Sequence, residues 1–388
     1  MDLEEGFNVF YGHNGQGKSN LFEGIYILSI AKSSRVSNDK FLINNDLIET
    51  GGHAQILGIA EEKNHNIKAQ VDYDISSNKD LDKTFRINGV IVSTQEFVGN
   101  INSVFFDTDD IAIISGPPLV RRKYINILLS QINNDHVKNL QRFQKVLYQR
   151  NSLLKNIKDG KSKEIELDFW DDRLAEESSS IFYERNKILL KIRDNSKNFA
   201  LGFNKEINLD IKYLPKIGRL ENDNFFEENN SPEKIKLFFA NSLGKNRARD
   251  IDQRNTTLGP HRDDFGIYFN GSPASITASR GQSRIISLSL KLSEAKEIKN
   301  IVDAKPILIL DDIFSELDEN MREKVISEIQ DFDQVLLSTA DLALIDKKVV
   351  QNARFFSINN GSINQDWSIY QVQMFHEENL PQYLSHFD

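Results

Sequence analysis

The feature that most restricts the folds open to this chain is an eight-residue segment near its N-terminus, where three glycines precede a lysine and a serine. Its residues are Gly12, His13, Asn14, Gly15, Gln16, Gly17, Lys18 and Ser19. The segment matches the pattern G-x-x-x-x-G-K-[ST], whose glycines let backbone N–H groups close around phosphate oxygens. An apolar run at 7–10 precedes it and a helical pattern follows through Leu21 and Leu28, which is the strand, loop and helix order that the motif requires. We therefore expect a nucleotide phosphate site rather than an ordinary Gly-rich turn.

The lysine and the serine of this motif have separate tasks. The lysine reaches the β- and γ-phosphates, and the hydroxyl is a ligand of the accompanying Mg²⁺. We assign these roles to Lys18 and Ser19, and we expect ATP and Mg²⁺ as the ligands of the site.

An acidic strand far downstream complements the loop. Four apolar residues at 307–310 are followed directly by Asp311 and Asp312, which is typical of a buried parallel strand that delivers carboxylates at its C-terminal edge. We expect Asp311 to hold the Mg²⁺. Asp312 would act with Lys18 in catalysis by orienting or deprotonating the attacking water. Because apolar strands often end in aspartate, this assignment depends on the phosphate loop upstream.

The separation of the two features indicates an insertion. Lys18 and Asp311 are 293 positions apart, which is too long for one compact β-α-β unit. The 388 residues therefore indicate one nucleotide-binding fold interrupted by a second domain, rather than domains in a row.

Periodicity along the intervening chain alternates between strand and helix. Residues 53–115 indicate an antiparallel sheet with an Asn88-Gly89 hairpin turn. Residues 121–200 are mainly helical, and an Asn/Asp/Glu-rich stretch at 221–230 indicates a surface loop. The final part predicts a strand at 265–269, an Asn270-Gly271 turn, a helix at 282–299 and the acidic strand.

Composition excludes several classes of protein. The chain has no cysteine, so disulfide frameworks and thiolate zinc sites are excluded, which suits a reducing cytoplasm. The N-terminus is acidic and no run approaches the ~20 apolar residues of a spanning helix. We expect a cytoplasmic protein without a membrane partner.

The charge distribution bears on whether the protein binds nucleic acid. The net charge of −9 argues against it when taken alone. However, residues 121–163 hold eleven Lys and Arg against only Asp135 and Asp159, so this stretch carries +9 and the rest of the chain −18. The alternative is that these charges lie on a helix face that is only in contact with solvent. The excess of positive charge in one stretch instead favours a surface that binds the phosphate backbone of a nucleic acid. The candidate DNA contacts are Arg121, Arg122, Lys123, Arg142, Lys145 and Arg150, and a smaller cluster comprises Arg247, Arg249, Arg254 and Arg262.

Two short motifs flank the acidic strand. Ser279-Arg280-Gly281-Gln282 stands at an expected helix start, where a plain N-cap and a contact to a phosphate of another subunit are both open. Ser315-Glu316-Leu317-Asp318 follows the acidic strand directly.

Taken together, the motifs resemble the ABC-type ATPase head of the SMC class and, within it, the RecF family of bacterial DNA replication and repair proteins. Markers of that family recur in order over nearly the whole chain, including Asn14–Leu21, Gly116-Pro117, Gln149-Arg150-Asn151 and Gly259–Asp264. The resemblance adds Asn20 to the phosphate loop. It also implies a composite ATP site in a dimer, completed by Ser279, Gly281, Gln282 and Asp318 of the second subunit.

The resemblance implies an α/β fold, namely a two-lobed ABC/SMC-type P-loop ATPase head of mixed sheets and helices with an inserted, mainly helical second domain. Residues 1–115 and 256–388 would form the head, and 116–255 the inserted domain with the candidate DNA and dimer surface. An ATP-driven homodimer would clamp gapped DNA, single- or double-stranded, and slow ATP hydrolysis would reset it. RecR and RecO would be partners in helping RecA replace single-strand-binding protein.

This sequence departs from the family pattern at three places. The phosphate loop begins at residue 12, so we expect a truncated N-terminus and leave the adenine site unassigned. Residues 103–107 contain no glutamine where ABC heads often carry a Mg²⁺ contact. The usual histidine after the last sheet strand is absent, which leaves Ser338 or Thr339 to sense the γ-phosphate and is consistent with slow hydrolysis.

Two other classes of protein carry the same ATPase-head motifs. The nucleotide-binding subunit of an ABC transporter would be a compact chain of about 250 residues, and it leaves the 116–255 insertion unexplained. An SMC-like structural ATPase would carry sustained heptads, which are missing here.

Overall fold

A computed structural model describes residues 1–36, 38–44, 52–62, 65–76, 80–220, 225–229, 231–302, 305–345, 349, 351 and 353–365. The chain forms two compact units. The first combines Met1–Asp110 with the chain from Lys291 onward, and the second is Ile111–Leu290. The second unit therefore extends through residues 256–290, beyond the segment 116–255 that the sequence led us to expect as an insertion.

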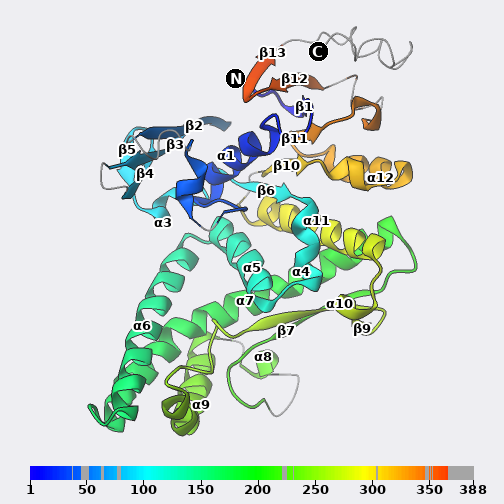
Figure 1. The fold of residues 1–388 in the computed structure, drawn as a ribbon. Helices are drawn as coiled ribbons and strands as arrows, with labels where there is room; N and C mark the ends of the chain where they lie inside the picture. The colour runs from blue at the N-terminus through cyan, green and yellow to red at the C-terminus, as the bar shows by residue number, and fades with distance from the viewer. Residues whose placement is uncertain are drawn as a thin grey trace. The chain divides into compact units, whose positions relative to one another are not determined.

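A six-stranded sheet forms the centre of the first unit (Figure 1). Its order is β13-β12-β1-β11-β10-β6, and every neighbouring pair is parallel except β12 and β13. The middle strands are buried on both faces, as expected for apolar strands of a parallel sheet. The strands are β1 (Gly6–Tyr11), β6 (Ser103–Phe106), β10 (Ile307–Asp311), β11 (Gln334–Thr339), β12 (Arg354–Asn359) and β13 (Ser362–Gln365).

A four-stranded antiparallel sheet completes the first unit, in the order β2-β3-β4-β5. It comprises β2 (His53–Glu62), β3 (His65–Ile75), β4 (Leu81–Ile87) and β5 (Val90–Val92). The expected turn at Asn88-Gly89 is confirmed, because both residues have positive φ and Ile87 pairs with Val90. The expectation of one antiparallel sheet over 53–115 was wrong for β6, which pairs in parallel with β10 of the central sheet.

Helices of the first unit fix the phosphate loop and the acidic strand. Helix α1 (Lys18–Ile30) begins at the loop and contacts strands of both sheets. Gly58 of β2 lies so close to it that an added Cβ would be 2.6 Å from Cδ1 of Leu28. After β10 the chain forms η4 (Ile313–Glu316) and α12 (Glu319–Ile329), while α3 (Thr94–Phe97) and the short helices η1 (Asp39–Leu42) and η2 (Thr108–Ile111) lie in loops.

The second unit is mainly helical. Its helices are α4 (Ala112–Ser115), α5 (Pro118–Ile132), α6 (Asn134–Lys158), η3 (Glu164–Glu166), α7 (Leu167–Phe203), α8 (Phe225–Glu228), α9 (Pro232–Gln253) and α10 (Ala274–Thr277). Helix α7 contacts both α6 and α9, and the buried side chains of Phe143, Phe182 and Phe239 belong to their common core. The expected loop at 221–230 contains α8, and its residues 221–224 and 230 lie outside the described part of the chain.

A three-stranded antiparallel sheet completes this unit in the order β7-β8-β9, from β7 (Leu209–Leu214), β8 (Asp264–Phe269) and β9 (Ser272–Pro273). The expected Asn270-Gly271 turn joins β8 to β9 with positive φ at both residues. The boundary between the two units falls within α11 (Arg280–Val302), which contains the helix expected at 282–299.

Candidate nucleotide site and candidate DNA interface

The strand order brings the two sequence motifs to one edge of the central sheet. The phosphate loop follows β1, Asp311 ends β10, and β11 lies between these two strands. Tyr11 pairs with Thr339, and Asp311 pairs with Ser338. All three strands are parallel, so their carboxyl ends meet at the place where α/β sheets bind ligands.

The glycines of the loop adopt conformations that other residues rarely accept. Gly12, Gly15 and Gly17 have φ angles of 151°, 82° and 106°. A Cβ at Gly12 would lie 2.4 Å from the carbonyl oxygen of Ile358, whereas a Cβ at Gly15 would meet nothing within 4 Å. The loop is thus packed on β12 at its start and open at its middle, which leaves room for a phosphate group to approach the backbone.

Lys18 directly follows the last glycine of the loop and begins α1. Its Nζ donates to the carbonyl oxygens of Gly12 and His13, and its side chain is buried. Burial lowers the pKa of Lys18, and the charges of Asp312 and Asp311 oppose that shift. A cation held by two carbonyl oxygens of the loop, with open space beside Gly15, fits the phosphates of a nucleotide.

The remaining loop residues have distinct surroundings. His13, Asn14 and Asn20 are exposed, and Ser19 is half-buried in the first turn of α1 beside Lys18. Gln16 contacts the turn between β12 and β13, because its Oε1 accepts from the Asn360 amide at 2.6 Å and its backbone oxygen accepts from the Gly361 amide. This support for the loop was not anticipated, although Asn360-Gly361 is a strong hairpin signal.

Asp311 is held by two donors. The hydroxyl of Ser338 donates to its Oδ1 at 2.6 Å, and Nη2 of Arg35 donates to its Oδ2 at 2.6 Å. Arg35 also lies 3.5 Å from a carboxylate oxygen of Asp107, in the segment where glutamine is missing. No local sequence pattern indicates this role of Arg35, because it lies 276 positions from its partner.

Asp312 follows in a left-handed conformation with φ of 51°. Its amide donates to the Ser338 hydroxyl at 2.9 Å, and its carbonyl accepts from the hydroxyl of Ser315. Burial raises the pKa of the Asp312 carboxyl, opposed by a hydrogen bond from Ser315 and by the charge of Lys18. A carboxylate with a raised pKa, at a backbone position that is costly for a non-glycine residue, is suited to accept a proton.

Ser279 forms a capping box at the start of α11. Its amide donates to Oε1 of Gln282 at 2.8 Å, and its hydroxyl accepts from the Gln282 amide. Ser279 and Gly281 are exposed in the second unit. Asp318 is exposed in the first unit and caps α12 by accepting from the Met321 amide. An N-cap role is therefore visible for both Ser279 and Asp318.

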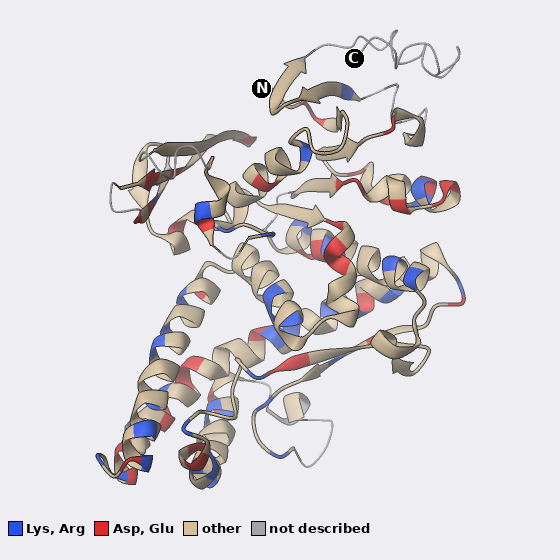
Figure 2. Ribbon diagram, viewed as in Figure 1, with Lys and Arg blue, Asp and Glu red and all other residues tan. Residues whose placement is uncertain are grey.

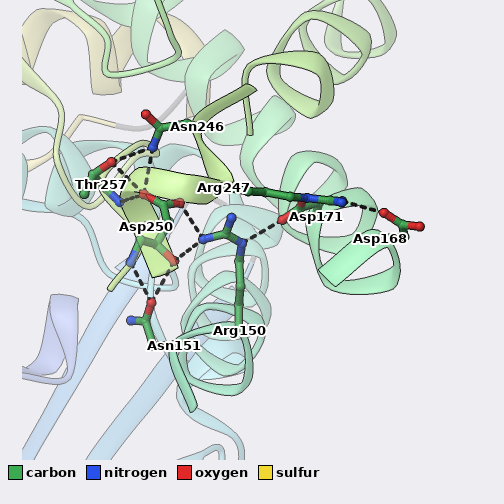
Figure 3. Close-up of polar contacts among 9 residues, drawn as sticks. Arg150, Asn151, Asp168, Asp171, Asn246, Arg247, Asp250 and Thr257 are labelled. Carbon is green, nitrogen blue, oxygen red and sulfur yellow. Dashed lines mark hydrogen bonds and ion pairs between the residues drawn. The ribbon is translucent and has the colours of Figure 1, made fainter. Parts of the chain in front are cut away.

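Arg150 corrects the list of candidate DNA contacts. Its side chain is fully buried between helices, and it forms ion pairs of 2.8 Å with both Asp171 and Asp250 (Figure 3). It also donates to the hydroxyl of Thr256. Because no face of this guanidinium reaches solvent, Arg150 cannot contact a DNA backbone in this structure.

The network around Arg150 joins three helices. Arg247 of α9 binds Asp171 at 2.7 Å and Asp168 at 2.6 Å, both on α7 (Figure 3). Asp250 accepts from Asn246 and Thr257, and Asn151 of α6 accepts from the amide of the neighbouring Thr256. Arg247, from the smaller basic cluster, is thus also engaged within the protein.

Two candidate DNA contacts at the start of α5 form hydrogen bonds within the protein. Arg121 forms two hydrogen bonds to the Asp264 carboxylate, of 2.6 and 2.9 Å. Arg122 donates to the carbonyl oxygen of Asp263, and burial lowers its pKa. Lys123 is exposed.

Lys and Arg recur along α6 (Figure 2). Arg142 and Lys145 are exposed and form no ion pair with any described residue, and Lys155 is exposed on the same helix. Tyr148, between them, is 73% exposed. We call Arg142, Lys145, Tyr148 and Lys155 the α6 basic face; within α6, Asp135 in the first turn is the single acidic residue.

Within the described residues, no helix combines the length and apolar character needed to cross a membrane. In the same part of the chain, no group of three or more His, Asp or Glu side chains is arranged to hold a metal ion. A Mg²⁺ that binds through one carboxylate, a hydroxyl and nucleotide phosphates needs no such group.

Comparison with known proteins identifies the family. The family model "RecF/RecN/SMC N terminal domain" matches residues 1–364. A protein of Thermoanaerobacter pseudethanolicus named "DNA replication and repair protein RecF" is 35% identical over 365 residues, which cover 94% of each chain. The chain belongs to the RecF family. A protein of the same name from Clostridium botulinum is 33% identical over 94% of this chain and 95% of its own.

Solved RecF structures share the fold. The structure titled "Structure of the recombination mediator protein RecF-ATPrS in RecFOR pathway" has a TM-score of 0.83 and 31% identity, covering 94% of this chain and 93% of its own. A second, titled as RecF-ATP in the RecFOR pathway, has a TM-score of 0.82 and 32% identity, covering 95% and 93%. The expected ABC/SMC-type ATPase head is thereby confirmed for this RecF-family chain.

Proposed function

We propose that this chain is an ATP-dependent DNA-binding protein of recombinational repair and replication restart. The observation that carries the proposal is the row at the carboxyl edge of the central sheet, where Lys18, Ser338 and the Asp311-Asp312 pair come together. The family and the RecF-ATP title of a similar solved structure support ATP as the ligand.

The chain's own residues divide the work at this edge. The loop amides from Gly12 to Lys18 and the Lys18 ammonium bind the phosphates, and Asn20 lies in the helical turn that follows. Ser19 and Asp311 would hold Mg²⁺, whose positive charge screens the phosphates when it is bound. Asp312 accepts a proton from the attacking water, for which its raised pKa suits it.

Slow hydrolysis follows from the contacts of Asp311. Nη2 of Arg35 engages the Oδ2 oxygen of this carboxylate. Freeing an oxygen from the Arg35 guanidinium breaks a charge-assisted hydrogen bond, which adds to the barrier. We therefore expect a weak, DNA-dependent ATPase whose hydrolysis resets DNA binding.

The active form in this proposal is a head-to-head dimer. Ser279, Gly281 and Gln282 at the exposed start of α11, together with Asp318, would complete the ATP site of the partner subunit. The amides at that helix start favour an anion, and the capping hydroxyl of Ser279 is close to them. ATP would therefore join the two subunits.

Light scattering of the unmodified protein and three variants, with and without ATP, tests this dimer. We expect Lys18→Ala to lose ATP binding and to remain monomeric, and Ser279→Arg to bind ATP but to remain monomeric. Ser275→Arg is the matched control, since Ser275 is exposed on the adjacent α10. If the unmodified protein binds ATP but stays monomeric, or if Ser279→Arg still dimerises, the dimer mechanism is wrong.

The second compact unit is the proposed inserted domain, and its α6 basic face is the proposed DNA contact. Arg142, Lys145 and Lys155 offer uncompensated positive charge, and an exposed aromatic ring such as Tyr148 can stack on a base. The substrates would be gapped DNA, single- or double-stranded. RecR and RecO are the proposed partners on the basis of the RecFOR titles of the similar structures, and RecA is proposed from the family resemblance of the sequence.

A further inference from the structure

The segment that carries Arg35 begins with a sharp turn after α1. Ala31 caps the helix in a left-handed conformation, with φ of 60°. The chain then passes through residues 32–36 and, beyond residue 38, enters η1 at Asp39. We call the described residues 31–36 and 38–39 the Arg35 segment. At its middle, Arg35 contacts the carboxylates of Asp311 and Asp107.

One lysine of the antiparallel sheet holds both ends of this segment. Nζ of Lys83, on β4, donates to the carbonyl oxygen of Ala31 at 2.7 Å and to Oδ2 of Asp39 at 2.8 Å. The ammonium also lies over the rings of Tyr73 and Phe85, at 5.0 and 5.3 Å from their centroids. Aromatic faces and two oxygen acceptors give this cation a single well-defined position.

The middle of the segment is tied to the helix that begins at the phosphate loop. The hydroxyl of Ser33 accepts from the amides of Arg35 at 3.0 Å and Val36 at 2.8 Å. The same hydroxyl donates to the carboxylate of Glu23, which is buried on α1. Ser33 and Glu23 therefore hold the backbone next to Arg35, and Lys83 holds the two ends of the segment.

We propose that Lys83 is a positioning residue for the nucleotide site, which acts by setting where the Arg35 guanidinium lies against the Asp311 carboxylate. Arg35 is four residues from Ala31 and four from Asp39, so a shift of either end moves the guanidinium. Arg35 occupies one oxygen of the carboxylate assigned to Mg²⁺. Lys83 would therefore affect the Mg²⁺ concentration at which nucleotide binding is half-maximal. The inference rests on the proposed function, because it requires that Asp311 serves a bound cation.

A purely structural role for Lys83 makes a different prediction, and a double-mutant cycle separates the two. Binding of a fluorescent ATP analogue is titrated with Mg²⁺ in the unmodified protein, in Lys83→Met, in Arg35→Ala and in the double variant. We expect Lys83→Met and Arg35→Ala each to lower the Mg²⁺ concentration for half-maximal binding, by roughly threefold to tenfold. In the Arg35→Ala background, Lys83→Met should have no further effect, because it acts through Arg35.

Three controls accompany the double-mutant cycle. Lys68→Met removes an exposed lysine of β3 in the same sheet and should leave the Mg²⁺ dependence unchanged. Analogue binding in EDTA should be the same in all variants, which reports an intact phosphate loop. Methionine retains the apolar stem of Lys83, and thermal unfolding shows whether the variant is folded.

Each outcome has one meaning. A Lys83→Met effect that persists in full in the Arg35→Ala background assigns Lys83 a structural role and overturns the inference. An Mg²⁺ dependence identical to that of the unmodified protein overturns it as well. Failure of the unmodified protein to bind the analogue would instead overturn the proposed function.

Discussion

Arg150 and Asp250 are 100 positions apart, and their side chains form a 2.8 Å ion pair with no exposed surface on either residue. The pair joins α6 to α9, and a second carboxylate from Asp171 of α7 completes the neutralisation of the arginine. A cation that looked like part of a DNA-binding surface in the sequence is thus a link between three helices.

Removing this arginine should destabilise the second unit. Arg150→Leu leaves the buried Asp250 carboxylate without its cation and leaves Asp171 with Arg247 alone, so we expect a loss of about 3–5 kcal/mol in the free energy of unfolding. Arg142→Leu, on the exposed side of the same helix, should change it by less than about 0.5 kcal/mol. Urea denaturation followed by circular dichroism measures both. Equal stability of the two variants would argue against the network.

Ser338 should matter more for hydrolysis than for ATP binding. Ser338→Ala removes the donor to Asp311 and the acceptor of the Asp312 amide, while the phosphate loop remains intact. We expect single-turnover ATP hydrolysis to fall about 10- to 100-fold, by analogy with residues that orient metal ligands. Ser315→Ala, which removes a bond to the Asp312 carbonyl, is the milder comparison. Parallel loss of ATP affinity would contradict this role.

The loop glycines should differ in their tolerance of alanine. Gly12→Ala places a Cβ against the Ile358 carbonyl, so the loop or β12 must shift, and ATP affinity should fall more than about tenfold. Gly15→Ala meets open space and incurs only the backbone cost of its positive φ, about 1–2 kcal/mol. Calorimetric titration with ATP compares the two. A larger loss for Gly15→Ala would mean that the loop is not packed as described.

A buried histidine should give the second unit a pH-dependent stability. Burial lowers the pKa of His136 to about 3, whereas an unfolded histidine titrates near 6.5. Between these values the unfolded chain binds a proton that the folded chain does not, so the contribution of His136 to stability falls as the pH drops from about 6.5 toward 3. His136→Gln removes this dependence. The difference in urea midpoint between the unmodified protein and His136→Gln should therefore change between pH 7 and pH 5, to the disadvantage of the unmodified protein, and a constant difference would refute the assignment.

The α6 basic face predicts a specific change in the salt dependence of DNA binding. Lys145→Glu should weaken binding for all sequences and reduce the slope of log affinity against log salt by about 1. Lys197→Glu makes the same charge change on an exposed position of α7 and is the matched control. Fluorescence anisotropy with gapped DNA at several salt concentrations, with ATP, measures the slopes. Indistinguishable slopes for the two variants would exclude α6 from the interface.

Local signals predicted the elements that carry the motifs. The phosphate loop, the acidic strand and the Asn88-Gly89 and Asn270-Gly271 turns depend on residues close together in sequence, and each forms as expected. The class of the fold also followed, because the two halves of the nucleotide site are recognisable on their own.

Contacts between distant segments were not predictable in the same way. The pairing of β6 with β10, and the contact of Arg35 with Asp311, depend on strand order, which no local pattern encodes. Arg150 did leave a signal, since it occurs seven positions after Phe143 and four before Leu154, on the buried side of α6. That spacing indicates burial, and charge counting alone overlooked it.

The strand order of the central sheet also constrains how this protein is made. Strand β1 precedes the other described strands in the sequence, but among them it pairs only with β11 and β12, and both of these lie beyond residue 333. During synthesis, β1 and the phosphate loop therefore lack these sheet neighbours until residues 334–359 have left the ribosome. The nucleotide site is therefore a product of late, long-range folding, and an N-terminal fragment ending near residue 110 has no parallel neighbour for β1.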